Sequence, residues 1–267
     1  MHLVGRRAHR DLSGRVVLTK QPKRILVVNP NTTDAVTQAY VDAITAISPA
    51  DVTFKGVTGT FGAKIVTVEA ENTVAAYGTL ALIAEHVVGF DSVILAISFD
   101  SGLSAAQSIL PLPVVGISNA ALLAAAKGER AVGVIFFGEK SRALYENLIA
   151  TYGVTPVGCA AIEIGSVDDY LTPQSKDAAV LQATADLVAA GAESIAIFGS
   201  AIVGMAARLQ PYAAVPLYDG LEALSETLQQ IKNAPELNAN LQLPVGPSEN
   251  LSQELIQLMA GTLIKRI

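Results

Sequence analysis

The chain contains an internal repeat, and this repeat constrains the fold more than any other feature. Residues 91–110 read DSVILAISFDSGLSAAQSIL and residues 193–209 read ESIAIFGSAIVGMAARL. Four identities occur at an offset of 102 positions: Ser92 and Ser194, Ser98 and Ser200, Gly102 and Gly204, and Ala105 and Ala207. Each copy is an apolar run, a serine, a glycine and then an Ala-rich run of helical character. The repeat therefore predicts two related half-molecules.

The position of the repeated serine indicates where a site would lie. In both copies the serine follows directly on a strand-like run, before a helix-like one. In open α/β sheets, ligands bind outside the carboxyl ends of the strands. We therefore expect Ser98 and Ser200 to face each other across one site between the two halves.

The rest of the chain alternates between strand-like and helix-like segments. Strands are expected at 24–28, 52–57, 92–97, 114–117, 131–137, 155–160, 194–198 and 215–218. Helices are expected at 34–47, 69–88, 118–127, 139–151, 174–190, 219–231 and 251–264, with a loop at 164–173 and a surface crossing at 234–248. Such alternation predicts an α/β fold with parallel sheets and right-handed crossovers. Two pseudo-symmetric parallel-sheet domains fit the repeat, with the site in the cleft between them.

Three segments follow from this division. Residues 1–22 form a basic N-terminal tail, either flexible or a contact arm in an oligomer. The first α/β domain is expected at 23–117 plus 219–267, because the helices after 219 are expected to return to it. The second α/β domain is expected at 118–218.

Composition excludes several classes of protein. Residues 1–24 carry seven Arg and Lys against one Asp, a net +6, so a chain total of −6 leaves −12 for the remainder. An acidic body argues for no nucleic acid partner. The apolar runs are strand-sized, so no membrane span is expected, and the first 22 residues lack the apolar core of a secretory signal. A cytoplasmic location follows by default.

Common sites with a sequence signature are missing. Cys159 is the single cysteine and the three histidines lie at 2, 9 and 86, so no metal cluster has ligand spacing. The dinucleotide, P-loop and nucleophile-elbow motifs are absent. We therefore expect no metal cluster and, since the candidate donors at the strand ends are backbone N–H groups and hydroxyls, a small-molecule substrate.

Six segments resemble the aspartate/glutamate/hydantoin racemase superfamily, with the hydantoin and allantoin racemase branch nearest. They are RILVVNPNTT at 24–33, Phe61-Gly62, AISFDSGLSAA at 96–106, PVVGISNAA at 113–121, FGSA at 198–201 and PLYDG at 216–220. The resemblance spans residues 24–230 in the right order. It implies two flavodoxin-like domains, a homo-oligomer and an isomerase that acts at an α carbon without a cofactor.

The resemblance also implies a departure at the reacting groups. The family's usual chemistry uses two cysteine thiols, one removing a proton and the other delivering one to the opposite face. Those cysteines match Ser98 and Ser200 here, and Cys159 matches neither. A serine hydroxyl is a far weaker acid than a thiol, so two-base racemisation is in doubt.

Several interpretations stay open. The chain acts on a small carboxylate or hydantoin-like substrate as a racemase-family enzyme, or it only binds a small ligand. It is alternatively a decarboxylase-type or isomerase-type relative, in which the pocket stabilises an enolate without a protein base. The two serines are natural, or they are engineered replacements made to trap a substrate.

Other candidate residues follow the strand ends. Besides the catalytic candidates Ser98 and Ser200, the expected substrate-binding residues are Asn29, Phe61, Phe99, Ser118, Asn119 and Ala201. The N–H groups of Phe99 and Ala201 are the expected oxyanion donors, and those at Ser118 and Asn119 suit an anion or a helix cap. Asp100 is expected to be a surface helix cap, Tyr170 to serve packing, and Cys159 to be a buried small hydrophobe.

Overall fold

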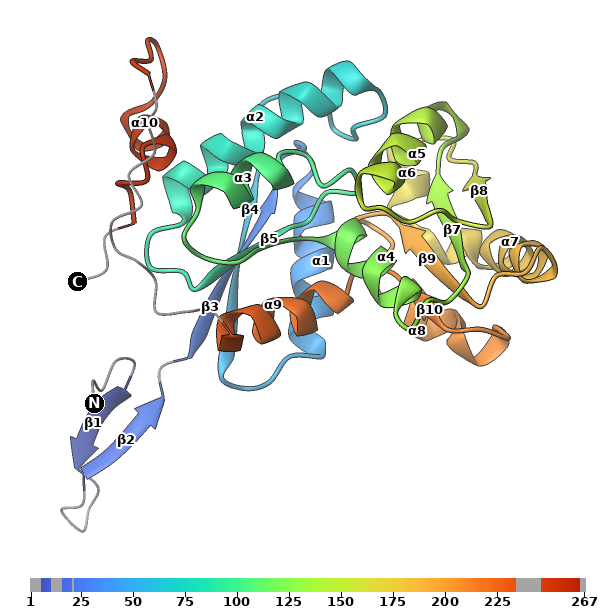
Figure 1. Ribbon diagram of the computed structural model, residues 1–267, viewed down its shortest axis with the longest axis horizontal. Coiled ribbons are helices and arrows are strands. Elements are labelled where there is room, and N and C mark those ends of the chain that lie inside the picture. The colour runs from blue at the N-terminus through green and yellow to red at the C-terminus, as the bar shows by residue number, and fades with distance from the viewer. Residues whose placement is uncertain (1–5, 11–15, 21, 234–245, 265–267) are drawn as a thin grey trace.

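Two four-stranded parallel sheets with flanking helices make up the body of the molecule (Figure 1). The computed structural model describes residues 6–10, 16–20, 22–233 and 246–264. Both the two-sheet architecture and the α/β class predicted from the internal repeat are confirmed. Helix α4 (Ile117–Ala126) lies between the sheets and packs against the second one.

The first sheet has the spatial order β4-β3-β5-β6. Its strands are β4 (Val52–Thr58), β3 (Lys23–Asn29), β5 (Ser92–Leu95) and β6 (Val114–Gly116). Its helices are α1 (Asp34–Ala46), α2 (Glu69–His86) and α3 (Leu103–Ile109). Helix α9 (Glu222–Asn233), from late in the chain, packs against β5 and β6.

The second sheet repeats this order as β8-β7-β9-β10. Its strands are β8 (Gly158–Ile162), β7 (Val132–Phe137), β9 (Ser194–Phe198) and β10 (Leu217–Tyr218). Its helical segments are η1 (Glu139–Ser141), α5 (Arg142–Thr151), α6 (Val167–Tyr170), η2 (Pro173–Lys176), α7 (Asp177–Ala189), α8 (Met205–Leu209) and η3 (Gln210–Tyr212). The equivalent order of the two sheets is what the 102-residue offset predicts.

The strands are apolar because helices cover both faces of each sheet. All six residues of β7, VGVIFF, are buried. Alternate residues face different clusters: Ile135 and Phe137 contact the side with α7 and α8, whereas Val134 and Phe136 contact the side with α5. The latter cluster continues into the first half, where it includes Leu26, Leu95 and α2 residues. One apolar cluster therefore joins the two sheets.

Several expected boundaries differ from the observed ones. The strand expected at 155–160 is β8, three residues later, because Pro156 precedes the first paired residue. The loop expected at 164–173 contains the short helix α6. The terminal helix is only α10 (Gln253–Met259), which packs on α2, and most of the crossing expected at 234–248 lies outside the described residues.

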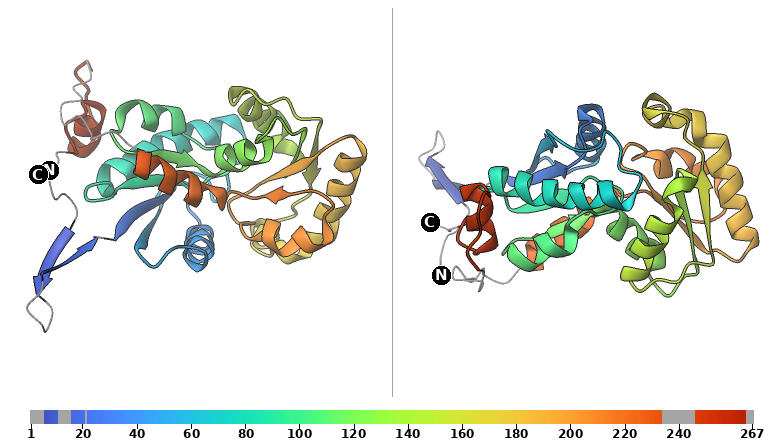
Figure 2. Two further views of the ribbon diagram at one scale, coloured as in Figure 1. Left: turned by 60° about the horizontal axis from the view of Figure 1, so that its bottom comes forward. Right: turned by 90° about the horizontal axis from the view of Figure 1, so that it is seen from above.

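The basic N-terminal segment contains an antiparallel hairpin of β1 (Arg6–Arg10) and β2 (Val16–Lys20). Figure 2 shows this hairpin projecting from the first-sheet end of the molecule. None of the helices in the described part of the chain has the length and apolar character to cross a bilayer. We propose to retain the two-domain division expected from the sequence, because α9 packs on the first sheet.

The repeated glycines have a conformational reason. Gly102 and Gly204 precede α3 and α8 with φ angles of 82° and 87°, in the left-handed region. Residues with a side chain rarely adopt this region, whereas glycine does so freely. Both halves therefore turn from strand to helix in the same way, which places the loops carrying Ser98 and Ser200 at equivalent ends of the two sheets.

The end of β6 lies close to the loop after β5, and a substitution at Gly116 tests this contact. A Cβ atom at Gly116 would lie 2.3 Å from the carboxyl carbon of Asp100. We expect Gly116→Ala to lower the free energy of unfolding by about 1–3 kcal/mol through overpacking. Urea denaturation followed by circular dichroism measures the change. The control is Gly246→Ala, since a Cβ at Gly246 meets no atom within 4 Å; equal stabilities of the two variants would contradict the packing at Gly116.

Candidate active site

A cavity of about 500 Å³ lies where the carboxyl ends of the two sheets meet. It is lined by both repeated serines and by residues from the loops after β3, β4, β5, β7 and β8. The lining residues are Asn31, Ala63, Lys64, Ile65, Val66, Thr67, Glu71, Ile97, Ser98, Phe99, Phe137, Gly138, Glu139, Lys140, Ser141, Tyr145, Glu163, Ile164, Gly165, Ser166, Tyr170 and Ser200. Ser98 and Ser200 thus share one cavity, although they lie 102 positions apart in the chain.

Ser98 lies three residues beyond the end of β5 and is buried. Its carbonyl oxygen accepts a hydrogen bond from the Ser118 hydroxyl at 2.6 Å. Its own hydroxyl oxygen lies 2.7 Å from the hydroxyl oxygen of Tyr145, and either group can donate. This short contact makes the two hydroxyls one polar unit at the cavity wall.

Tyr145, on α5, was not predicted as a site residue. Its ring packs against Phe99 and Phe136, with centroid distances of 4.4 and 4.7 Å, and near Phe198. Burial raises the pKa of Tyr145, with a smaller contribution from Tyr170, so its hydroxyl stays protonated at neutral pH. Tyr145 can therefore donate a hydrogen bond but does not supply a base. Because it lies within an ordinary helical pattern, only the tertiary structure identifies it.

Ser200 also has a tyrosine neighbour. The Tyr170 hydroxyl accepts a hydrogen bond from the N–H of Ala201 at 3.4 Å. Burial raises the pKa of Tyr170, and interactions with Ala201 and with Ser200 oppose that rise. Tyr170 serves packing as expected, since it lies in the hydrophobic cluster of the second half and contacts Phe137, and its hydroxyl also binds the loop after β9. The Ala201 N–H, expected to be an oxyanion donor, is already bonded within the protein.

Asn31, rather than Asn29, reaches the cavity. Asn29 is fully buried and does not line it; its amide nitrogen donates to Asn31 Oδ1 at 2.9 Å and to the Thr37 hydroxyl at 3.0 Å. The Thr33 N–H also donates to Asn31 Oδ1, at 3.0 Å, which identifies this atom as the oxygen. Within the described residues, nothing accepts from Asn31 Nδ2. Asn31 therefore presents a free amide donor, and the expectation for Asn29 is corrected to a turn-forming role.

Asp100 caps the helix N-terminus at Ser118 and Asn119, for which the sequence left both an anion site and a helix cap open. Its carboxylate accepts hydrogen bonds from the N–H of Ser118 at 3.2 Å, the N–H of Asn119 at 2.7 Å and the hydroxyl of Tyr152 at 2.7 Å. Asp100 is buried rather than exposed, and it caps α4 rather than a surface helix. Ser118 and Asn119 are outside the cavity lining, since their N–H groups already bind this carboxylate.

Of the other residues considered from the sequence, Phe99 lies in the cavity wall and Phe61 and Cys159 lie elsewhere. Phe99 lines the cavity, and among the described residues nothing accepts from its N–H. Phe61 is 44% exposed and packs near Tyr77 instead of lining the cavity. Cys159 is half-buried on β8, away from both serines, and burial raises its pKa. No three His, Cys, Asp or Glu side chains gather in a metal-binding arrangement within the described ranges.

The charged groups of the cavity lie at its mouth. Glu71 accepts from the Thr67 N–H at 2.8 Å, and Glu139 pairs with Arg142 at 2.6 Å. Lys64 and Lys140 are exposed, and neither forms an ion pair with a described residue. Glu163 is the remaining exposed acid of the lining. Deeper in the cavity, the polar groups are hydroxyls, amides and backbone N–H groups.

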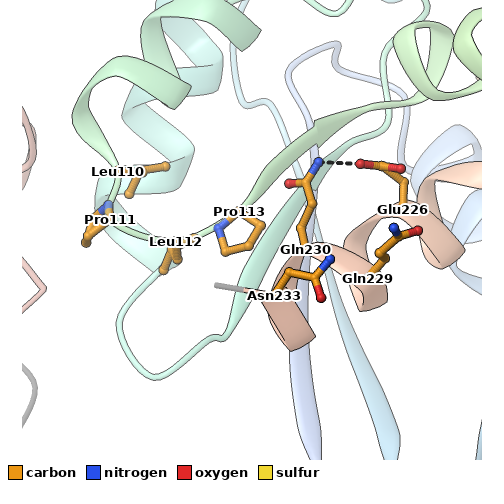
Figure 3. A pocket seen from close by; sticks show the side chains of 8 residues that line it. All are labelled: Leu110, Pro111, Leu112, Pro113, Glu226, Gln229, Gln230 and Asn233. Atoms are coloured by element: carbon orange, nitrogen blue, oxygen red, sulfur yellow. Dashed lines mark hydrogen bonds between the residues drawn. The ribbon is translucent and has the colours of Figure 1, made fainter. Parts of the chain in front are cut away.

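A second cavity, of about 420 Å³, lies at the opposite end of the first sheet (Figure 3). Residues 110–113, just before β6, form one wall, and α9 forms the other with Glu226, Gln229, Gln230 and Asn233. The Gln230 amide donates to Glu226 at 2.6 Å. Because this cavity is at the amino end of β6, it is separate from the serines.

The pH dependence of stability tests the environment of Asp100. Burial raises the pKa of Asp100 to about 7, and its hydrogen bonds to Tyr152, Asn119 and Ser118 only partly oppose this. Because the folded pKa exceeds the unfolded value, the folded state binds more protons between them. We expect the free energy of unfolding to fall by a few kcal/mol as pH rises from about 4 to 7.

Urea unfolding across this pH range measures the effect in the parent and in Asp100→Asn. The variant should be less stable overall but should show a shallower decline with pH. Burial also raises the pKa of Asp219 and Glu222, so part of the decline should persist in the variant. Identical slopes in the two proteins would contradict the raised pKa of Asp100.

Comparison with known proteins identifies a family and similar structures. Residues 25–228 match the family model described as Asp/Glu/Hydantoin racemase. A hydantoin racemase of Paenarthrobacter aurescens is 24% identical over 214 residues, covering 78% of this chain and 90% of that protein. The structure of allantoin racemase from Klebsiella pneumoniae superposes with a TM-score of 0.75 at 23% identity, covering 87% of this chain and 98% of that one.

A related fold occurs in a decarboxylase. The structure of arylmalonate decarboxylase has a TM-score of 0.55 at 12% identity and covers 80% of this chain and 95% of that one. At this identity the likeness shows the fold alone. The family match spans most of the chain, and it includes the strands and loops that build the serine cavity. The chain therefore belongs to the Asp/Glu/hydantoin racemase family.

Proposed function

We propose that this chain is a cofactor-independent enzyme that acts at the α carbon of a small carboxylate or hydantoin-like substrate. The observation that carries the proposal is the shared cavity of Ser98 and Ser200 between the two sheets. Membership of a racemase family and likeness to hydantoin and allantoin racemases support an isomerase-type reaction. The exposed Lys64 and Lys140 at the mouth suit an anionic substrate.

The reacting groups make this site a poor racemase. Racemisation requires a base that removes the α proton and an acid that returns one to the other face. The two serines, at the positions that resemble the family's cysteines, are adjacent to tyrosines whose pKa values are raised by burial. Neither hydroxyl is a competent base near neutral pH. The site therefore stabilises a developing enolate by hydrogen bonds better than it starts proton abstraction.

Decarboxylation is the second candidate, and the neutral, aromatic interior favours it. In that reaction the bond between the α carbon and one carboxylate breaks, its electron pair remains on the substrate as an enolate, and CO₂ leaves. A proton from solvent or from a hydroxyl then completes the product. No protein base is needed for the first step. Incubation with phenylmalonate, followed by NMR detection of phenylacetate, tests this reaction.

The racemase proposal is tested in deuterated water with enantiopure 5-benzylhydantoin and with allantoin. Optical rotation and loss of the α-proton NMR signal report the reaction. We expect the parent chain to fall below the ordinary enzymatic range of about 1–10³ per second, because it lacks a base. The variant Ser98→Cys/Ser200→Cys should gain activity by at least about tenfold, since a thiol is much more readily ionised.

Two controls accompany this experiment. The variant Ser98→Ala/Ser200→Ala should gain no racemase activity. Adding Cys159→Ser to each variant shows whether the original thiol contributes to the measured activity. Racemisation by the parent at ordinary rates would contradict our account of the serines. A chain that binds these compounds but transforms neither them nor phenylmalonate would instead be a binding protein.

A further inference from the structure

The two halves of the cavity are equivalent in backbone course but not in hydrogen-bonding capacity. Two residues beyond the end of β3 the first half has Asn31, whereas β7 of the second half ends with Phe137, and both line the cavity. After β5 the Phe99 N–H has no acceptor among the described residues. After β9 the corresponding Ala201 N–H is bonded to Tyr170. Of the two N–H groups that follow the repeated serines, only that of Phe99 therefore lacks an acceptor among the described residues, whereas both halves keep hydroxyls in the cavity.

The Ser98–Tyr145 pair adds one donor to the first half. Two hydroxyls carry two protons, and their mutual 2.7 Å hydrogen bond uses one of them. The other proton remains available whichever group donates. Since burial keeps Tyr145 protonated, the pair always offers one O–H and never a full negative charge. Either hydroxyl alone would also offer one O–H, so the two are interchangeable as donors.

We propose that the cavity holds a single oxyanion, on its first-half side, between Asn31 Nδ2, the Phe99 N–H and the Ser98–Tyr145 pair. Phe137 and Tyr170 provide an apolar wall for the substituent on the second-half side. The corresponding ligand class is a small monoanion with an aryl or alkyl group, and Tyr170 determines specificity by covering the Ala201 N–H. This assignment rests on the proposed function for the identity of the site, but it concerns binding alone.

The test uses phenylacetate as the anionic probe and phenylacetamide as its neutral counterpart, both measured by calorimetry or ligand-observed NMR. The ratio of the two affinities separates recognition of charge from general damage to the cavity. The parent should bind phenylacetate more tightly than phenylacetamide. Failure of the parent to prefer the anion would overturn the proposal.

Asn31→Asp is the first variant. It keeps an oxygen for the bonds from Asn29 and Thr33 but replaces the free amide donor by a carboxylate oxygen. We expect phenylacetate binding to weaken at least about tenfold while phenylacetamide binding changes much less, because a charged hydrogen bond is replaced by repulsion. Equal losses for the two probes would contradict the role of Asn31.

The Ser98–Tyr145 pair is tested by a double-mutant cycle. Ser98→Ala and Tyr145→Phe each leave one hydroxyl, so each alone should reduce phenylacetate affinity by no more than about threefold. The double variant removes the last O–H and should lose at least about tenfold more than the product of the two single effects. A double effect equal to that product would overturn the single-donor assignment.

Tyr152→Phe is the matched control, because it also removes one tyrosine hydroxyl but lies outside the cavity lining. This half-buried tyrosine donates its hydroxyl to Asp100, so its loss should leave the ratio of the two probe affinities unchanged. A loss of anion preference in Tyr152→Phe as large as in Asn31→Asp would contradict the role of Asn31. The proposed function is tested independently of this binding proposal. It would be wrong if the expected binding pattern is found but no substrate is converted.

Discussion

The ring of Tyr145 packs between Phe99 of the first half and Phe136 of the second, and the relation between the two sheets at the cavity depends on this contact. The apolar cluster that contains these rings runs from α2 and β5 through α5 to β9. Its burial drives the two halves together without directional bonds. The hydroxyl at the end of the ring then fixes Ser98 by a single short hydrogen bond. The same side chain therefore contributes to packing and to the polar wall of the site.

The sequence predicted the fold well because the fold depends on local, repeated signals. Apolar runs followed by Gly102 and Gly204 require left-handed turns at equivalent points, and this alone places the two serines at matching strand ends. The sharing of one cavity follows from that symmetry. The site details were less predictable, since they depend on side chains distant in sequence. Tyr145 and Tyr170 lie in an unremarkable helix and in an expected loop, and nothing in their neighbourhood marks them.

Competition for hydrogen-bond donors decides which of the expected donors bind within the protein and which remain free. An exposed helix N-terminus at Ser118 would bind an anion, but the buried carboxylate of Asp100 occupies it, and this pairing spans 18 residues. The Ala201 N–H is occupied in a similar way by Tyr170. In contrast, the amide of Asn31 is left free because Asn29 and Thr33 bind only its oxygen. Propensity and spacing identify potential donors, whereas only the packed structure shows which donors remain.

The balance of hydroxyls, amides and aromatic rings defines what the cavity can do. It offers neutral donors in a partly apolar interior, where hydrogen bonds to a developing charge are stronger than in water. It lacks the readily ionised thiol that two-base racemisation uses. Under the proposed function the cavity supports enolate chemistry, and the substrate determines which reaction follows. A carboxylate that leaves as CO₂ needs no base, whereas an α proton does.

The most direct test of this account is a crystal structure of the protein with phenylacetate. The account predicts the carboxylate in the cavity shared by the two serines, with its oxygens about 2.6–3.2 Å from Asn31 Nδ2, the Phe99 N–H and a hydroxyl of the Ser98–Tyr145 pair. The phenyl ring should contact Phe137 and Tyr170. A carboxylate bound instead at the Ala201 end of the cavity, or outside the cavity altogether, would contradict it.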